Sequence, residues 1–295
     1  MRAIQTRGLG RRYGRRWALR GCTLAVEPGR TVALVGPNGA GKTTLLKLIA
    51  GLAMPSAGEL LVFGAPPSQE PSALRRVGFL AQDVPLYGQL DVGDTMEMGR
   101  RMNPSWDGRV AAAHLDRLGL RPRDRVGDLS GGQRAQVALA LALAKRPDLL
   151  LLDEPLASLD PAARRSFLQE LMTAAAAREM TIVFSSHLIG DLERVCDHLV
   201  VLDHAKTLVS GDLEDVVNAH AVLTGPPADP SALPGVEEVI RQERTSRQTT
   251  ALVRLAHRPF DPSWRVDPVG LEELILAYLD PDTARPTTSP LEVAR

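Results

Sequence analysis

Short apolar segments recur along the chain, and each of them runs into a glycine or a polar residue. Thr31–Val35 is followed by Gly36, Leu149–Leu152 by Asp153, and Ile182–Phe184 by a pair of serines. Apolar runs of this length are typical of strands that are buried on both faces. The pattern therefore predicts a parallel sheet that is covered by helices on both sides.

Segments with helix signals follow these predicted strands. Lys42–Leu52 is expected to form a helix that ends near Gly51, Gln133–Lys145 one that ends before a proline, and Pro161–Ala177 one with proline at its first position. Asp160 directly precedes the third helix and can cap it. Alternation of strands and helices predicts an α/β fold class.

Two further regions depart from this alternation. Between Val77–Leu80 and the second strand the sequence becomes helical and polar, with Val110–Leu118 the clearest piece. Beyond a Pro/Gly-rich break at 224–235, a strand near Thr250–Leu255 and an apolar helical stripe near Leu271–Tyr278 predict an α+β appendage. We expect a large domain at 1–218 with a helical subdomain at about 83–147, an appendage at 219–280, and a disordered tail at 281–295.

The composition mainly argues against two classes of function, nucleic-acid binding and spanning of a membrane. The 295 residues carry 35 basic and 35 acidic side chains, so no net positive field favours nucleic acid, and no nucleic-acid partner is expected. The cluster of Arg11, Arg12, Arg15 and Arg16 is assigned no role. Two distant cysteines suit a reducing compartment, and the longest apolar run, Val137–Ala144, is too short to cross a bilayer. The chain is expected to be cytoplasmic.

The strongest chemical signal is the segment from Gly36 to Thr44, which follows a predicted strand and opens a predicted helix. This is the setting of a phosphate-binding P-loop. Its glycines and helix N-terminus present backbone N–H groups, Lys42 can reach the β- and γ-phosphates, and the Thr43 hydroxyl suits Mg²⁺. The predicted nucleotide-binding residues here are Gly36, Asn38, Gly39, Ala40, Gly41, Lys42, Thr43 and Thr44.

Two adjacent carboxylates, Asp153 and Glu154, follow the second apolar strand. Parallel sheets place ligand sites at this end of their strands. Asp153 is predicted to hold Mg²⁺ through its water shell. Glu154 is predicted to be the catalytic base that deprotonates the attacking water.

The pentapeptide Leu-Ser-Gly-Gly-Gln at 129–133 precedes this strand, and through it the chain resembles the ATP-binding cassette (ABC) family. Ser130, Gly131, Gly132 and Gln133 begin a helix, so they can form a second anion site. The resemblance covers about 1–218 and implies a P-loop NTPase cassette with a mainly parallel central sheet, an N-terminal antiparallel β part and the inserted helical subdomain. It also implies ATP and Mg²⁺ as cofactors, and head-to-tail pairing with a second cassette.

Four further residues are similar to family positions. Gln82 resembles the glutamine that senses Mg²⁺ and water, His187 the switch histidine at the γ-phosphate, and Asp160 the aspartate that crosses the dimer interface. Tyr13 resembles the aromatic residue that stacks on adenine. The other histidines, at 114, 198, 204, 220 and 257, show no metal-ligand spacing and are expected at the surface.

The resemblance implies an ATPase subunit that lies on the inner face of the membrane and powers a separate permease. The residues at 81–87, 102–107 and 133–136 are similar to those of bacterial exporter ATPases related to drug and bacitracin efflux. Homodimer and heterodimer both stay open. The alternative is a soluble ABC ATPase that acts on a cytosolic assembly, and a further one is a regulator that only binds ATP. An uninterrupted single cassette and the intact Glu154 and His187 favour the transporter subunit.

Overall fold

A six-stranded sheet lies at the centre of the computed structural model, which describes residues 1–67, 74–157, 159–187, 189–257, 259 and 261–280. The strands, in spatial order, are β5 (Val77–Leu80), β6 (Leu149–Asp153), β7 (Thr181–Ser186), β3 (Thr31–Val35), β8 (His198–Asp203) and β9 (Lys206–Asp212). The first five are parallel, and β9 is antiparallel to β8. The predicted mainly parallel sheet is confirmed.

Every residue of β3, β6 and β7 is buried. This explains why their sequences are apolar runs rather than alternating ones, since both faces of these strands are covered. The carboxyl ends of the three strands meet at one edge, where each passes into one of the predicted chemical segments.

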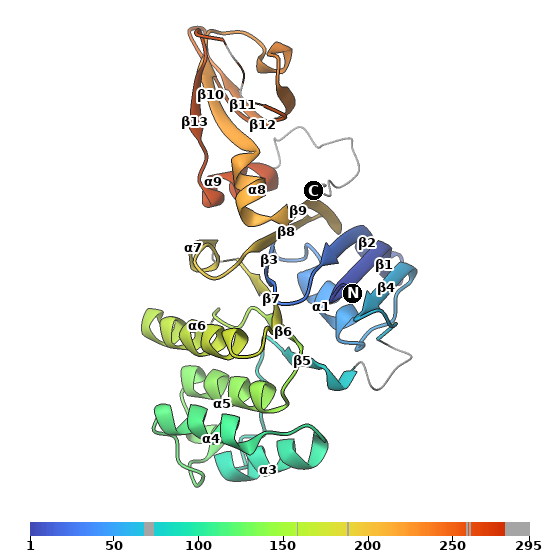
Figure 1. The fold of residues 1–295 in the computed structure, drawn as a ribbon, viewed down its shortest axis with the longest axis vertical. Helices are drawn as coiled ribbons and strands as arrows, with labels where there is room; N and C mark the ends of the chain where they lie inside the picture. Colours follow the sequence, from blue (N-terminus) through green and yellow to red (C-terminus); the bar gives the residue numbers. More distant parts are fainter. Residues whose placement is uncertain (68–73, 158, 188, 258, 260, 281–295) are drawn as a thin grey trace.

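A second sheet, antiparallel and N-terminal, packs beside the first (Figure 1). Its order is β2 (Arg16–Val26), β1 (Ile4–Tyr13) and β4 (Ala57–Val62). Helix α1 (Lys42–Ile49) lies in the apolar cluster that joins the two sheets. This helix ends three residues earlier than predicted, since Gly51 adopts a left-handed φ of 70° after the last turn.

Three helices come between β5 and β6 in the chain and lie at one end of the molecule (Figure 1): α3 (Val92–Met102), α4 (Gly108–Arg117) and α5 (Gly131–Ala144). A short 3₁₀ turn, η1 (Val126–Asp128), precedes α5, and α6 (Pro161–Ala176) follows β6. Asp91, Asp107, Ser130 and Asp160 cap these helices with their side chains. Local polar residues thus set where each helix begins.

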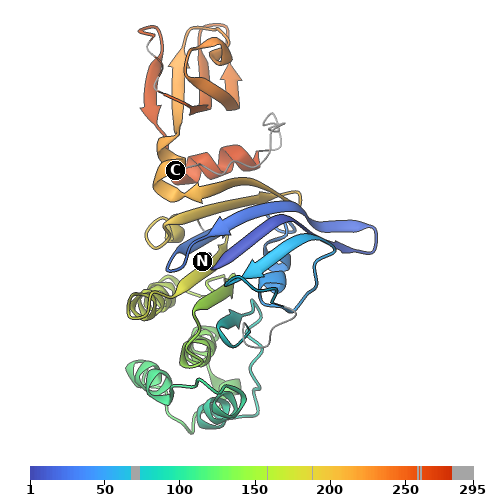
Figure 2. The same cartoon turned by 45° about the vertical axis from the view of Figure 1, so that its right-hand side comes forward.

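The C-terminal part lies at the opposite end of the molecule (Figure 2). It contains a four-stranded antiparallel sheet in the order β11 (Val236–Arg244), β12 (Thr249–Leu255), β10 (His220–Gly225) and β13 (Arg265–Pro268). The helices that follow β7 in the described chain are α7 (Ile189–Leu192), α8 (Leu213–Asn218), the 3₁₀ turn η2 (Pro230–Ala232) and α9 (Leu271–Leu279). The sheet has a small core of its own around Trp264. The tail predicted at 281–295 lies outside the described residues.

The expectation that the remaining histidines lie at the surface is wrong for two of them. His114 and His220 are only 1% and 6% exposed. Each is held by hydrogen bonds inside the fold, His114 to Gln136 and His220 to Tyr278. A buried histidine with partners on other elements leaves no local pattern in the sequence, so only the tertiary structure reveals it.

Candidate nucleotide-binding site

The segment between β3 and α1 forms a tight loop that only glycine permits at two points. A Cβ on Gly36 would lie 2.1 Å from the Leu202 carbonyl oxygen, and one on Gly41 would lie 2.5 Å from the Ala18 carbonyl oxygen. Gly41 also has a φ of 112° and begins α1 without any side-chain cap. The N-terminal amides of α1 are therefore left for a ligand, which suits an anion.

Lys42 is the first residue of α1, and its ammonium group is 5% exposed. It donates hydrogen bonds to the carbonyl oxygens of Gly36 at 2.7 Å and Pro37 at 3.3 Å. It also lies 3.3 Å from Oε1 of Glu154. Lys42 thus joins the loop after β3 to the carboxylates after β6.

Glu154 is held at the centre of this edge of the sheet. Its Oε2 lies 3.1 Å from Nδ1 of His187, at the end of β7, so that both carboxylate oxygens have a cationic or N–H partner. Because a carboxylate accepts hydrogen bonds, Nδ1 carries the hydrogen in this contact. Glu154 has a φ of 46°, a conformation that non-glycine residues rarely adopt. Backbone strain of this kind is concentrated at functional sites.

Ser185 is a buried link that the sequence analysis missed. Its hydroxyl donates to Oδ1 of Asp153 at 2.8 Å and accepts from the backbone N–H of Glu154 at 2.8 Å. One serine on β7 therefore fixes the orientation of both carboxylate residues on β6. Direct pairing of Asp153 with Ser185 in the sheet accounts for the contact, and strand pairing is not visible in the sequence.

Lys42 and Glu154 border an open cavity of about 470 Å³, whereas Asp153, Ser185 and His187 lie behind them and are not part of its lining. Its lining includes Asn38, Gly39, Gly41, Lys42, Thr43, Thr44, Gln82, Glu154 and Tyr13 from the predicted set, together with Arg16 and Trp17, which the sequence analysis missed. Gly36 and Ala40 are buried beneath the loop. The donors of this lining, namely backbone amides, one ammonium and two threonine hydroxyls, fit a nucleoside triphosphate. The two hydroxyls, the Gln82 amide oxygen and the Glu154 carboxylate of this lining are oxygen donors of the kind that Mg²⁺ prefers.

Tyr13 lies at the outer end of this cavity and is 49% exposed. The guanidinium of Arg11 lies 4.7 Å from the centre of its ring. Arg11 also donates a hydrogen bond to the carbonyl oxygen of Met54. The guanidinium of Arg12 lies over the ring of Trp17. Two residues of the arginine cluster, to which the sequence analysis assigned no role, therefore make contacts within the fold. A half-exposed aromatic ring with a fixed neighbour is able to stack on a planar base.

The segment at 130–133 does not line the cavity. It begins α5, where the Ser130 hydroxyl accepts from the Gln133 N–H at 3.2 Å and the Gln133 side chain accepts from the Ser130 N–H at 2.9 Å. Asp160 likewise lies outside the cavity and caps α6 by accepting from Ala162 and Ala163 at 2.9 Å each. These hydrogen bonds lower the pKa of the Asp160 carboxyl.

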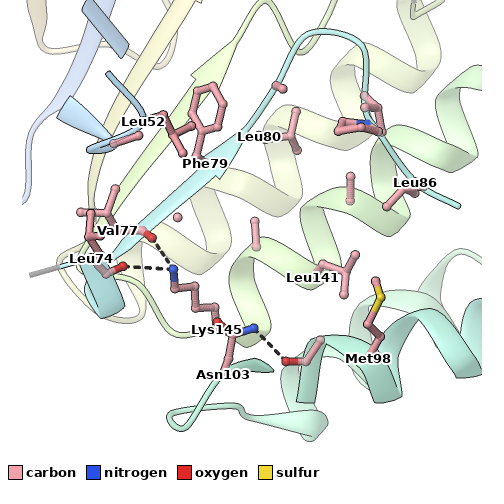
Figure 3. Close-up of a pocket in the computed structure, with 18 of the residues that line it drawn as sticks. Leu52, Leu74, Val77, Phe79, Leu80, Leu86, Met98, Asn103, Leu141 and Lys145 are labelled. Atoms are coloured by element: carbon pink, nitrogen blue, oxygen red, sulfur yellow. Dashed lines mark hydrogen bonds between the residues drawn. The ribbon is translucent and has the colours of Figure 1, made fainter. Parts of the chain in front are cut away.

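A separate apolar groove runs between the edge strand β5 and the helices α3 and α5 (Figure 3). Its walls include Leu52, Val77, Phe79, Leu80, Leu86, Met98 and Leu141. The ammonium of Lys145 donates to the carbonyl oxygens of Leu74 at 3.1 Å and Val77 at 2.6 Å, and its pKa is lowered by burial. Trp106 also lines this groove and lies against Gly99.

The chain is similar to proteins that bind and use ATP. Residues 19–157 match the family model described as ABC transporter. The chain is 35% identical over 245 residues to the Nod factor export ATP-binding protein I of Burkholderia orbicola, covering 78% of each chain. It is 36% identical over 206 residues to the thiamine import ATP-binding protein ThiQ of Salmonella typhimurium, covering 68% of this chain and 87% of the relative.

Among solved structures, the chain resembles a dimeric bacterial ABC transporter cassette with a TM-score of 0.64 and 25% identity. The match covers 71% of this chain and 98% of that cassette. Among the helices that the structure describes, the search for a span long and apolar enough to cross a membrane found none.

Proposed function

The chain belongs to the ABC transporter ATP-binding proteins and is an ATPase, and from this premise we propose that it powers a separate membrane permease as one of two paired cassettes. The observation that carries the proposal is the contact series Lys42–Glu154–His187 at the edge of the cavity. It joins a phosphate-binding loop, a carboxylate and a histidine from three strand ends. A protein that only bound ATP would not require the last two.

Each residue of the site has a proposed task. The backbone amides of 36–44 and the Lys42 ammonium hold the phosphates, and Tyr13 stacks on the base. Thr43, Asp153 and Gln82 would hold Mg²⁺, partly through water, and the ion would neutralise charge on the phosphates of ATP, the substrate whose phosphoanhydride bond is cleaved. Glu154 accepts the proton of the attacking water, and His187 fixes the carboxylate through its 3.1 Å contact.

The segment at 130–133 is proposed to act on a second chain. It is absent from the cavity lining of its own chain, although its helix N-terminus suits an anion. In the proposed pair, Ser130, Gly131, Gly132 and Gln133 of one cassette face the P-loop of the other, with Asp160 at the interface. The partner is a second cassette, either identical or related. Binding of ATP by both halves shifts the population toward the closed pair.

The apolar groove beside β5 is the proposed docking surface for a permease segment. Its only ammonium, Lys145, is satisfied by two carbonyl oxygens, so the described lining offers an apolar segment no free charge. Leu52 in its wall is 64% exposed. A short amphipathic helix would bury such apolar side chains. In this proposal the chain lies at the inner face of the membrane.

Export is the proposed direction of transport. The match to the Nod factor export protein covers 78% of the chain, which is more than 1–218 contain, so it extends into the C-terminal part. The match to the thiamine import protein covers 68%.

The division into domains is also part of the proposal: a nucleotide-binding domain at 1–218, with a helical subdomain at about 83–147, and an appendage at 219–280. The separate sheet of β10 to β13 supports it.

The enzymatic proposal is tested with Glu154→Gln, which keeps the shape of the side chain and removes the base. ATP hydrolysis is expected to fall by about 100-fold or more, because general-base catalysis contributes roughly that much. ATP binding is expected to persist, and the ATP-bound pair to accumulate in size-exclusion chromatography. Glu59→Gln on the exposed face of β4 is the matched control. Normal hydrolysis by Glu154→Gln would contradict the assignment of the base.

The partner is tested by purifying the tagged chain from detergent-solubilised membranes of its native cell and identifying what co-purifies at equal stoichiometry. A protein with several membrane spans supports the transporter subunit. Substitution of Leu141, inside the groove, by glutamate should then release this protein, whereas Leu276→Glu at an exposed position of α9 should not. Recovery with ribosomes or another cytosolic assembly would instead favour the soluble ATPase.

A further inference from the structure

The last helix of the described chain, α9, belongs to the main apolar core although it follows the C-terminal sheet. Leu271, Leu274, Ile275 and Ala277 are at most 2% exposed. They lie in the same cluster of buried residues as Phe184 of β7 and the residues of α5, α6 and α7, not in the small core around Trp264. The position of α9 is therefore linked to the nucleotide-binding part.

The direct neighbour of α9 in that part is α7. This helix begins at Ile189, two residues after His187, and is four residues long. A single helical turn is not stable on its own and depends on packing for its position. Leu192 of α7 is fully buried in the shared cluster. The orientation of the segment that carries His187 thus depends on what α7 packs against.

A polar contact fixes α9 from its other side. The Tyr278 hydroxyl lies 2.8 Å from Nε2 of His220 at the start of β10, and Nδ1 of His220 lies 2.6 Å from the carbonyl oxygen of Val216 on α8. Since the carbonyl accepts, Nδ1 donates, and in the neutral ring Nε2 accepts from the Tyr278 hydroxyl. Burial lowers the pKa of His220, which keeps the ring neutral. The last turn of α9 is therefore tied to the root of the C-terminal sheet.

We propose that α9 is a positioning element for hydrolysis: by packing on α7 it holds His187 at Glu154, so that the C-terminal sheet acts on turnover through α9. The inference rests on the role of His187 proposed above. Its physical basis is the packing of α9 on α7, which begins two residues after His187, together with the 3.1 Å contact between His187 and Glu154. Displacement of that histidine weakens hydrolysis without touching the groups that bind the nucleotide.

The test is Leu274→Ala, which removes buried side-chain atoms from the face of α9 that packs in the core. ATPase kinetics are measured on the full chain in the wild-type and His187→Ala backgrounds. In the wild-type background we expect kcat to fall about tenfold, because small misplacements of catalytic groups cost one to two powers of ten, with KM for ATP within about twofold. In the His187→Ala background we expect less than about a twofold effect, since residues that act through one another are not additive.

The matched control is Leu276→Ala on the same helix, where the side chain is 54% exposed, and kcat should be unchanged. Should Leu274→Ala fail to fold, Tyr278→Phe removes only the hydroxyl and takes its place in the same cycle, with a smaller expected loss of about threefold. An equal loss of kcat in both backgrounds, or a loss expressed mainly in KM, would overturn the proposal. A fully active His187→Ala single variant would contradict the role of His187 itself, and the positioning role with it.

Discussion

Two helices of this molecule begin with glycine-rich segments, and their N-termini are built differently. Helix α1 follows Gly41 with no side-chain cap, and the cavity at its N-terminus is also lined by residues of β1 and β2 and by Gln82 and Glu154, which follow β5 and β6. Helix α5 begins at Ser130 with a complete capping box, and none of its residues lines that cavity. The N-terminus of α1 thus opens into a cavity formed by its own chain, whereas the N-terminus of α5 does not open into that cavity.

In the proposed pair, this difference lets one chain supply the P-loop of one nucleotide site and the N-terminus of α5 to the other site. The loop before α1 gains its carboxylates and its histidine from neighbouring strand ends, because a parallel sheet collects those ends at one edge. In the part of the chain that the structure describes, the N-terminus of α5 is capped by its own Ser130 and Gln133 side chains. Its exposed glycines are consistent with a function that requires another molecule.

The largest expected effect that sharpens this comparison is that of Gly41→Ala. The added Cβ would lie 2.5 Å from the Ala18 carbonyl oxygen at a φ of 112°, so strain of about 3 kcal/mol is expected and ATP binding should be lost. The matched change at α5 is Gly131→Ala, where the Cβ would meet nothing within 4 Å. It should leave the unfolding free energy within about 1 kcal/mol of wild type. Thermal unfolding and fluorescent-nucleotide binding measure both, and equal losses would remove the distinction.

A second effect separates the two N-termini by ligand. Ser130→Arg should weaken ATP-driven pairing by about 100-fold, roughly 3 kcal/mol, while the ATP affinity of the monomer stays the same. The control is Ser130→Ala, which removes only the cap and should cost about 1 kcal/mol of stability. Analytical ultracentrifugation with Glu154→Gln in the background reports pairing without hydrolysis. Pairing that survives Ser130→Arg would argue against a role of α5 at a second chain.

The smallest effect concerns the anchoring of α5. His114 on α4 lies 3.0 Å from Oε1 of Gln136 on α5 and 3.4 Å from Oε2 of Glu170 on α6. Its pKa is lowered, mainly by burial, although Glu170 opposes the shift. The unfolded chain therefore binds more protons than the folded one, and this contribution to stability is lost as the pH falls below about 6.5.

The measurement is the melting temperature at pH 7.5 and pH 5.5 for the wild type and His114→Gln. The acid-induced decrease should be smaller in the variant by a few degrees, about 1 kcal/mol. His198 and His220, whose pKa values are also lowered by burial, are present in both proteins and cancel in the difference. Identical decreases would mean that His114 binds its proton as readily in the fold as in the unfolded chain, which would contradict the lowered pKa.

Much of the fold was predictable because its signals are local. Apolar runs identified β3, β6 and β7, and the capping residue Asp160 marked the first turn of α6, whereas α5 begins two residues before the predicted Gln133. The glycines and the one lysine at fixed spacing in 36–44 predicted a phosphate-binding loop. The termini of helices were less predictable, as α1 shows, because the last turn depends on packing.

The sequence by itself determined the buried strands of the central sheet, several of its helices, the candidate phosphate-binding loop and the family. Only the tertiary structure decided which groups meet: Ser185 between Asp153 and Glu154, Glu154 between Lys42 and His187, and α9 against α7. Spacing along a chain encodes hydrogen bonds within a helix or a turn. Contacts between residues more than 30 positions apart depend on strand order and on the packing of the whole core, and no local pattern encodes those.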